Sequence, residues 1–414
     1  MRKIQYLLFS LWIIILLSSL FFPTQLHPHS YTPYTLKEIK SYGVPYEKTK
    51  IFILDVNHDG DDDLLIDRHN LGLLCLRIDS FSFYPIMDNE YYAEGLASGI
   101  FDIDNDGFPE FLIVTFPDDS CFVACYDWLS PNKSSKPKYI IGPFLANQPK
   151  YSNRAKGVLK LFCFDANGNG EKELFVAVNN FYSGPVPRAV ICFSAENGEK
   201  KWDFKLGPII NEVSLAKLKN GRRRILISSF ATNNGAVWGG SADSLSYIFC
   251  LDPDGSLIWR KTIGGLHSWV NISVFDTDGD GTDDIIASRF YGDRVKHEKK
   301  KWGEWSVAVI NPEDGSIEKS IDFGDGSHCL FTSDLDWDNV KDIFLIGQDD
   351  RLIVLNSDLS IRWIREERTF HRVFAVVDLN NDGSKEIICK KSDSLVVLDS
   401  SGKTTASIPF NFST

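Results

Sequence analysis

At 414 residues, the chain is long enough for two or three ordinary domains or for one large all-β domain. Hydrophobic residues make up 43% of it and aromatic residues 13%, a composition that excludes a disordered chain. The formal net charge of −12 argues against a general nucleic-acid-binding protein, which would carry a basic face, so we expect no nucleic-acid partner.

The N-terminus carries an uncharged apolar run, from Tyr6 to Phe22, that follows Arg2 and Lys3 and precedes Pro23. A basic start and an apolar run are typical of a signal sequence, and this run is near the lower length limit of a membrane-spanning helix. No small-residue cleavage motif follows, so we favour an uncleaved signal anchor over a cleaved signal. A buried core helix is a third interpretation, but the run is not amphipathic. With either signal, residues from about 30 onward are exported to the periplasm or cell surface, or secreted if cleavage occurs.

A nine-residue acidic motif recurs along the rest of the chain. It has Asp at position 1, Asp or Asn at positions 3 and 5, and Asp or Glu at position 9. Position 6 is Gly in every copy but one, where Asn339 replaces it, and both residues tolerate a left-handed turn. Alternating oxygen side chains around a sharp turn suit a hard cation such as Ca²⁺. The six copies are DVNHDGDDD (55–63), DIDNDGFPE (102–110), DANGNGEKE (165–173), DTDGDGTDD (276–284), DLDWDNVKD (334–342) and DLNNDGSKE (378–386).

These copies are not EF-hand loops, which need a bidentate Glu at position 12 and a helix on each side. Position 12 is apolar in every copy, and the flanking segments are short β-rich runs such as KIFIL and LLI. The motif therefore predicts a cation loop between two strands. The residues at position 12 are Ile66, Ile113, Val176, Ala287, Leu345 and Cys389.

A seventh copy has lost its acidic residues. The segment 214–228 has the same strand–turn–strand outline, with Asn220-Gly221 at the turn, but its ligand positions hold Ala216, Leu218 and Arg224. Seven units therefore begin at 55, 102, 165, 216, 276, 334 and 378, spaced 44 to 63 residues apart.

Each later unit also repeats a second strand–turn–strand segment, as in AVICFSAENGEKKWDF (189–204) and YIFCLDPDGSLIWRK (247–261). Four strands per unit and seven units predict an all-β fold, a seven-bladed β-propeller with blades starting near 50, 97, 160, 211, 271, 329 and 373. We assign 1–30 to the signal peptide or anchor helix, 31–49 to a linker or closing segment, and 50–414 to the propeller. A solenoid is the alternative, but it would need polar capping repeats, which the sequence does not show.

The six acidic loops resemble the calcium loops of FG-GAP and VCBS repeats, which form integrin α-subunit-like propellers. The resemblance covers about residues 50–414 and implies about six structural Ca²⁺ sites. It implies ligands at positions 1, 3, 5 and 9 and a contribution from position 7, where Thr282 offers its carbonyl. The implied sets are Asp55, Asn57, Asp59, Asp61 and Asp63; Asp102, Asp104, Asp106, Phe108 and Glu110; Asp165, Asn167, Asn169, Glu171 and Glu173; Asp276, Asp278, Asp280, Thr282 and Asp284; Asp334, Asp336, Asp338, Val340 and Asp342; and Asp378, Asn380, Asp382, Ser384 and Glu386.

Two features depart from that family or qualify it. The Gly-Ala-Pro part of the FG-GAP pattern is missing, and Trp202, Trp259 and Trp363 each follow a turn in a way that resembles quinoprotein (PQQ-like) repeats. We interpret these tryptophans as blade-packing residues and assign no organic cofactor. Four cysteines fall at one strand position where later units have valine, which indicates a small buried apolar site and not a disulfide framework. They are Cys75, Cys125, Cys192 and Cys250, aligned with Val309, Val354 and Val397.

Strand order places the cation loops on one face of a propeller and the longest connections on the other. We expect a protein or carbohydrate ligand on the face opposite the loops. Three histidines in successive units precede their acidic motif by six to nine residues and could surround the channel mouth. The candidate ligand-face residues are Tyr182, Arg188, Trp238, His267, Arg289, Tyr291, Trp302, His328 and His371. They could equally be scattered surface residues and strand-end caps.

The sequence therefore favours an exported, membrane-anchored, monomeric binding or adhesion module stabilised by calcium, with no catalytic residue assigned. One alternative is a lyase-like polysaccharide-active enzyme that uses the histidines, two of which would then lie within hydrogen-bonding reach of a common point. The other is a sensory or assembly component of a cell-envelope complex.

Overall fold

In the computed structural model, the described residues are all-β and contain no α-helix. The described residues are 96–115, 121–127, 136–144, 158–179, 188–291, 305–324, 326–380 and 382–409, together with the strands named below from residue 8 to residue 84. Within this part of the chain, no helix is long and apolar enough to cross a membrane. Two short strands, β1 (Leu8–Phe9) and β2 (Trp12–Ile13), pair within the predicted anchor segment. The rest of that segment lies outside the described residues, and the anchor helix stays a prediction.

Most of the sheets are four-stranded antiparallel meanders formed by consecutive strands. Such a meander needs only short turns between neighbouring strands. The first two are β3 (Lys50–Leu54), β4 (Asp63–Asp67), β5 (Leu73–Leu76) and β6 (Phe81–Tyr84); and β7 (Leu96–Phe101), β8 (Glu110–Thr115), β9 (Phe122–Tyr126) and β10 (Tyr139–Ile141). The third is β11 (Val158–Phe164), β12 (Glu173–Asn179), β13 (Arg188–Ser194) and β14 (Lys200–Leu206). The last two are β25 (Ser327–Ser333), β26 (Asp342–Gly347), β27 (Leu352–Leu355) and β28 (Ile361–Arg365); and β29 (Phe370–Val377), β30 (Glu386–Lys391), β31 (Ser394–Leu398) and β32 (Thr404–Pro409).

One larger sheet consists of two such meanders. A single residue pair, Phe230 with Trp269, joins them. The first meander is β15 (Ile209–Lys217), β16 (Arg223–Phe230), β19 (Ser246–Leu251) and β20 (Leu257–Gly264). The second is β21 (Trp269–Phe275), β22 (Asp284–Phe290), β23 (Val307–Ile310) and β24 (Ile317–Ile321). A small hairpin of β17 (Val237–Trp238) and β18 (Ser241–Ala242) lies in the connection between β16 and β19.

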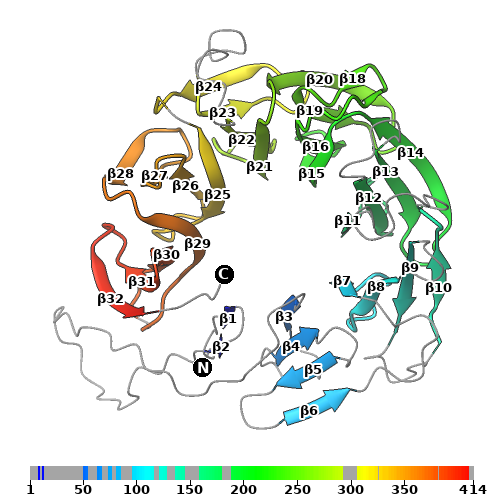
Figure 1. Ribbon diagram of the computed structural model, residues 1–414, viewed down its shortest axis with the longest axis horizontal. Coiled ribbons are helices and arrows are strands. Elements are labelled where there is room, and N and C mark those ends of the chain that lie inside the picture. Colours follow the sequence, from blue (N-terminus) through cyan, green and yellow to red (C-terminus); the bar gives the residue numbers. More distant parts are fainter. Residues whose placement is uncertain are drawn as a thin grey trace.

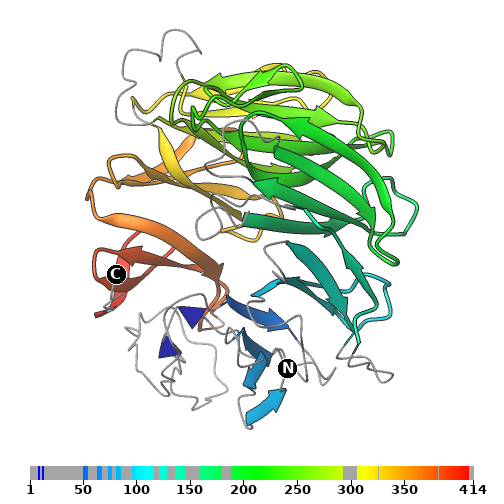
Figure 2. The ribbon, with the colours of Figure 1, turned by 45° about the vertical axis from the view of Figure 1, so that its right-hand side comes forward.

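The sheets follow one another around a ring, as Figure 1 shows, and Figure 2 shows the same ring obliquely. The first strand of each meander lies toward the centre, and it contacts the first strand of the next from β3 through β7, β11, β15, β21 and β25 to β29. This radial arrangement of meanders is a β-propeller.

Packing between neighbouring sheets supplies the core. One apolar cluster joins β7–β10 to β11–β14, another joins β11–β14 to the next meander, and further clusters continue to the β29–β32 sheet. From β8 onward, the middle of each second strand is buried on both faces, which is why these strands read as continuous apolar runs. For example, all seven residues of β12 (ELFVAVN) are buried.

The tryptophans of the fourth strands fasten adjacent sheets, which confirms the predicted packing role. Trp202 Nε1 donates to the Pro253 carbonyl at 2.9 Å, and Trp259 Nε1 donates to the Pro312 carbonyl at 2.9 Å. Trp363 Nε1 donates to the Ser400 carbonyl, also at 2.9 Å. Each acceptor lies in the hairpin turn between the third and fourth strands of the following sheet.

The strand-pair register also confirms the shared cysteine position. Cys125, Cys192 and Cys250 each pair with the aromatic residue of the fourth strand, and Val309 and Val354 take the same place in later sheets. Among the cysteines whose side chains the structure describes, none forms a disulfide: Cys121, Cys125, Cys163, Cys192, Cys250, Cys329 and Cys389. Burial raises the pKa of Cys125, Cys192 and Cys250 to about 12, as suits packing residues and not reactive thiols.

Candidate cation loops and the opposite face

Five of the acidic motifs lie in described residues, each in the turn between the first and second strands of a sheet. The exception is the copy at 55–63, since residues 55–62, with Asp55, Asn57, Asp59 and Asp61, lie outside the described residues and only Asp63 falls on a strand, β4. Asn381 of the last copy also lies outside them. The decayed copy forms the expected hairpin of β15 and β16, and its Arg224 pairs with Asp252 at 2.5 Å.

The side chains of each loop fold the backbone around themselves. In the 276–284 loop, Asp276 Oδ1 accepts the Gly279 amide at 2.7 Å, and Asp276 Oδ2 accepts the Gly281 amide at 2.9 Å. Asp278 accepts the Asp280 amide at 3.2 Å, and Asp280 accepts the Thr282 amide at 2.7 Å. The left-handed backbone at Gly279 and Gly281 lets the chain turn this sharply. The loop thus brings the carboxylates at positions 1, 3 and 9 toward one centre.

The acidic residue at position 9 is buried and closes each loop by accepting the amide of position 2. Glu110 accepts from Ile103 at 2.9 Å, and Asp284 accepts from Thr277 at 3.0 Å. The same bond recurs in the other described copies, from Ala166 to Glu173, from Leu335 to Asp342 and from Leu379 to Glu386.

The electrostatics of positions 1 and 9 differ. Burial alone would raise the pKa of Asp276, but the amides of Gly281 and Gly279 hold it below its usual value. Burial raises the pKa of Asp284, and it raises that of Asp342 to about 6. Ionising Asp284 and Asp342 in place is therefore costly, and a cation beside either carboxylate would lower that cost.

Carboxylate oxygens converge in three of the described loops, so these residues fit a metal ion. The groups are Asp102, Asp104 and Glu110; Asp276, Asp278 and Asp284; and Asp334, Asp336 and Asp342, and in each group the ligand atoms lie within 4.8 Å of one another. Two further observations agree with a cation. Asp102 Oδ1 is buried without a hydrogen-bond partner, and Asp284 makes no ion pair with a Lys or Arg of the described chain. These groups are compatible with calcium binding.

In three of the loops a basic residue at position 8 ties the loop to the preceding sheet, a role that we did not predict. Lys172 donates to the Asp102 carbonyl, and Arg223 of the decayed loop donates to the Asp165 carbonyl. Lys385 donates to the Asp334 carbonyl at 2.7 Å. The available signal was the basic residue that recurs at position 8 in these loops.

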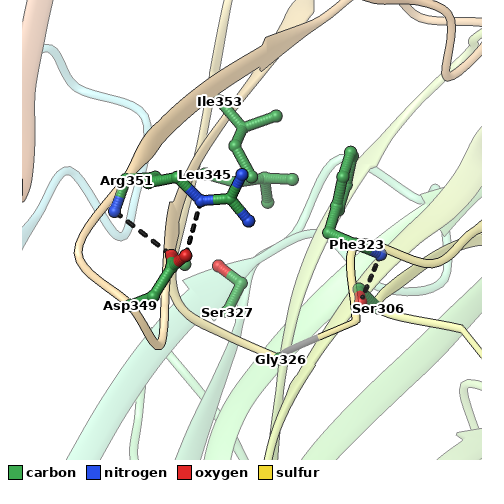
Figure 3. Close-up of a pocket in the computed structure, with 9 residues that line it drawn as sticks. Ser306, Phe323, Gly326, Ser327, Leu345, Asp349, Arg351 and Ile353 are labelled. Atoms are coloured by element: carbon green, nitrogen blue, oxygen red, sulfur yellow. Dashed lines mark hydrogen bonds and ion pairs between the residues drawn. The ribbon is translucent and has the colours of Figure 1, made fainter. Parts of the chain in front are cut away.

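The opposite end of the propeller carries a small pocket, between the sheets that contain β23 and β26. Leu345, Ile353 and Phe323 form its apolar part, and Asp349 and Arg351 line one side. Figure 3 shows Arg351 turned toward Asp349, while Ser306 and Phe323 lie across from them. Arg351 Nε lies 2.5 Å from Asp349 Oδ2. The remaining lining residues are Gly326, Ser327 and Gly347.

An aromatic stack, missed in the sequence, lies beside this pocket. The rings of Trp269 and Phe290 stack with centroids 3.7 Å apart, and Phe230 packs edge-on against Trp269 at 5.7 Å. All three side chains are partly exposed. A Cβ added at Gly326, in the pocket, would lie 3.1 Å from the Phe290 Cα, so stack and pocket are contiguous. The two rings come from different strands of one sheet, so no local motif marks them.

The predicted ligand-face residues that the structure describes lie at this end, but their exposure differs. Arg188 and Arg289 are fully buried, and Tyr291 is 5% exposed. Arg289 lies over the rings of Tyr291 and Trp305, 4.7 and 4.2 Å from their centroids. Tyr182 and Trp302 lie outside the described residues.

The remaining candidates are the histidines and Trp238, on the β17–β18 hairpin. His267 and His371 are exposed, whereas His328 and Trp238 are half-buried. Among the described residues, no hydrogen bond or ion pair joins two of the three histidines, and His371 instead lies 3.7 Å from Asp350.

No family model matches the chain. A curated human (Homo sapiens) protein, "Cartilage acidic protein 1", is 22% identical over an alignment of 268 residues that covers 58% of this chain and 39% of that protein. The chain therefore spans less than half the length of this curated relative. Among solved structures, rhamnogalacturonan lyase YesW aligns with a TM-score of 0.49 and 12% identity over 87% of this chain and 70% of its own. A quinohemoprotein alcohol dehydrogenase, ADHIIG from Pseudomonas putida HK5, aligns with a TM-score of 0.48 and 10% identity over 87% of this chain and 68% of its own.

Proposed function

We propose that the protein is an extracytoplasmic, seven-bladed β-propeller that binds a protein or carbohydrate ligand and that Ca²⁺ stabilises. The observation that carries this proposal is that the two ends of the ring carry different features. One end holds acidic loops that are bonded to their neighbours, and the other holds a pocket beside partly exposed aromatic rings. The apolar run after Arg2 and Lys3 supports export and anchoring.

The metal role is structural in this proposal. Calcium prefers oxygen ligands, and the acidic loops offer carboxylates at positions 1 and 9 together with carboxylates or amide oxygens at positions 3 and 5. The loop side chains already hold the backbone, so a bound ion would mainly offset repulsion among carboxylates. A ligand that binds only the folded chain stabilises it by mass action.

We expect chelation to lower the melting temperature. One site held at about 100 times its dissociation constant contributes about 2.7 kcal/mol, and several sites add to this. Thermal unfolding of the full-length chain would be followed by circular dichroism in EDTA, in excess Ca²⁺ and in excess Mg²⁺. Identical melting in EDTA and Ca²⁺ would contradict the metal role.

Ligand binding should depend on the aromatic stack. Aromatic rings that are partly exposed beside a pocket serve as binding platforms for sugars and as anchors in protein interfaces. Glycan and protein arrays probed with the full-length chain would identify a ligand, and Trp269→Ala should weaken its binding by about tenfold or more.

The matched control for this variant is Trp337→Ala, because Trp337 is 55% exposed on the cation-loop end. We expect it to leave binding unchanged. If Trp337→Ala abolished binding and Trp269→Ala did not, the ligand would bind the loop end, and the proposed face would be wrong. Melting temperatures of both variants would separate lost binding from lost folding.

A further inference from the structure

In the five meanders from β11 onward, the fourth strand leaves one residue unpaired at the level of the turn between the first and second strands. The strand-pair register shifts at this point, so that one residue of the fourth strand is left without a partner, which is a β-bulge. In the β11–β14 sheet, Phe193 pairs with Lys200 and Cys192 pairs with Trp202, which leaves Lys201. The corresponding residues elsewhere are Ile258, Glu318, Arg362 and Thr405, and Lys138 precedes the first residue of β10 at the same level.

In three sheets this residue is basic and pairs with the loop. Lys138 Nζ lies 2.8 Å from Asp104 Oδ2 and 2.9 Å from Glu110 Oε1, so that it bridges positions 3 and 9. Lys201 Nζ lies 2.7 Å from Glu173 Oε1.

Arg362 repeats the pattern in the β25–β28 sheet. It contacts Asp336 at position 3 and lies 3.5 Å from Asp342 at position 9. The ammonium and guanidinium groups of these residues lie on the side of the loop carboxylates where a metal ion would also bind.

The chemistry of this residue changes with its loop. Where the loop has lost its carboxylates and carries Arg224, the bulge residue is Ile258. Where the loop has five carboxylates, at 276–284, the bulge residue is Glu318, whose Oε1 accepts a hydrogen bond from Asn311 Nδ2 at 2.8 Å. Asp284 of that loop makes no ion pair with a basic residue of the described chain, although it is only 7% exposed. This loop therefore gains a further negative charge where its counterparts gain a positive one.

We propose that the bulge residue of the fourth strand sets the cation affinity of its loop. Lys138 and Arg362 act as internal counter-ions, so that a metal ion has to compete with them in the 102–110 and 334–342 loops. Glu318 adds negative charge to the 276–284 loop, which becomes the tightest of these three sites. Affinities of calcium loops are tuned by the charge count of their ligands, and partners of the ligands change metal affinity by roughly 10- to 100-fold. This inference rests on the proposed calcium role. It adds that the loops differ in their calcium affinity.

The test exchanges the charge of the bulge residue. After EDTA treatment and desalting, the full-length chain would be titrated with CaCl₂ in a calorimeter. Glu318→Lys should weaken the tightest site roughly 10- to 100-fold, and Lys138→Met should tighten a weak site or add one bound ion. Arg362→Met should act like Lys138→Met. Glu196→Lys, on an exposed turn, and Lys200→Met, which removes an exposed pair with Asp203, are the charge-matched controls and should change nothing.

Each outcome decides between the inference and the function on which it rests. If the wild-type chain binds no calcium, the proposed metal role itself is wrong. If it binds calcium but Glu318→Lys and Lys138→Met leave every affinity unchanged, the metal role stands and the inference is overturned. Glu318→Gln covers the case in which Glu318→Lys fails to fold, as judged by circular dichroism, and it should weaken the same site by a smaller factor.

Discussion

Arg188→Met is expected to lower the free energy of unfolding by about 3 to 5 kcal/mol, the cost of leaving one partner of a buried ion pair alone. Arg188 is fully buried, and its Nη1 lies 3.5 Å from Asp243 Oδ2, whose residue is 2% exposed. The guanidinium also donates to the Gly207 carbonyl and to Thr232. Removing the guanidinium leaves the Asp243 carboxylate buried, without its counter-ion and out of reach of water. Urea unfolding of the full-length chain would measure the loss.

Asp243 is itself held by the backbone, which makes the loss hard to relieve. It accepts the amides of Asn234 at 2.8 Å and Gly235 at 3.2 Å, so the carboxylate cannot turn toward solvent without unfolding the connection between β16 and β19. Arg188 therefore fastens that connection to the sheet β11–β14. The double variant Arg188→Met/Asp243→Asn should recover part of the loss, because it removes the stranded charge.

An exposed pair from the same sheet gives the control. Lys205 lies 3.8 Å from Asp203, and both side chains are substantially exposed, at 55% and 33%. Lys205→Met should cost about 1 kcal/mol or less. If Arg188→Met costs no more than this and instead abolishes ligand binding, Arg188 is a ligand-face residue and not a structural one.

Arg188 also shows where prediction from sequence ends. The segment 178–188 looks like a long connection, and its arginine like a surface residue. The structure begins β13 at Arg188 and covers it with the connection between β16 and β19, whose Asp243 is 55 residues away in the chain. Burial of this kind depends on how neighbouring sheets pack, so a local sequence pattern does not predict it.

The cation loops were predictable to a greater depth because their interactions are local. Asp276 binds amides three and five residues ahead, so that a nine-residue motif contains nearly all the contacts that shape the loop. The contacts made by Lys138 and Arg362 were not predictable in the same way. Lys138 is 28 residues from Glu110, and Arg362 is 26 residues from Asp336. The position of the fourth strand brings each of these side chains to its loop, and for Arg362 a bulge in that strand is also needed.

Gly255→Ala is expected to cost about 2 to 5 kcal/mol, the sum of two penalties. Gly255 has a φ of +86°, and a left-handed residue with a Cβ costs about 1 to 2 kcal/mol. An added Cβ would also lie 2.6 Å from Trp202 Cδ2, in the ring that fastens this turn to the preceding sheet. Moving a packed ring adds about 1 to 3 kcal/mol. Chemical denaturation of the full-length chain would measure the total.

Gly221→Ala separates the two penalties, because Gly221 has a similar φ of +79° but nothing within 4 Å of an added Cβ. It should cost only the backbone penalty. In a Trp202→Ala background, Gly255→Ala should fall to the same value, since the clashing ring is gone. Equal costs for the two glycine variants in the wild-type background would contradict a fastening role for Trp202.

One turn of the chain lacks both the aromatic ring and the glycine that Trp202 and Gly255 represent. Where the preceding fourth strand has Lys319 in place of an aromatic residue, the turn position is Leu359 with a φ of +67°. The glycine is therefore retained where an aromatic ring packs on it, and a side chain replaces it where none does.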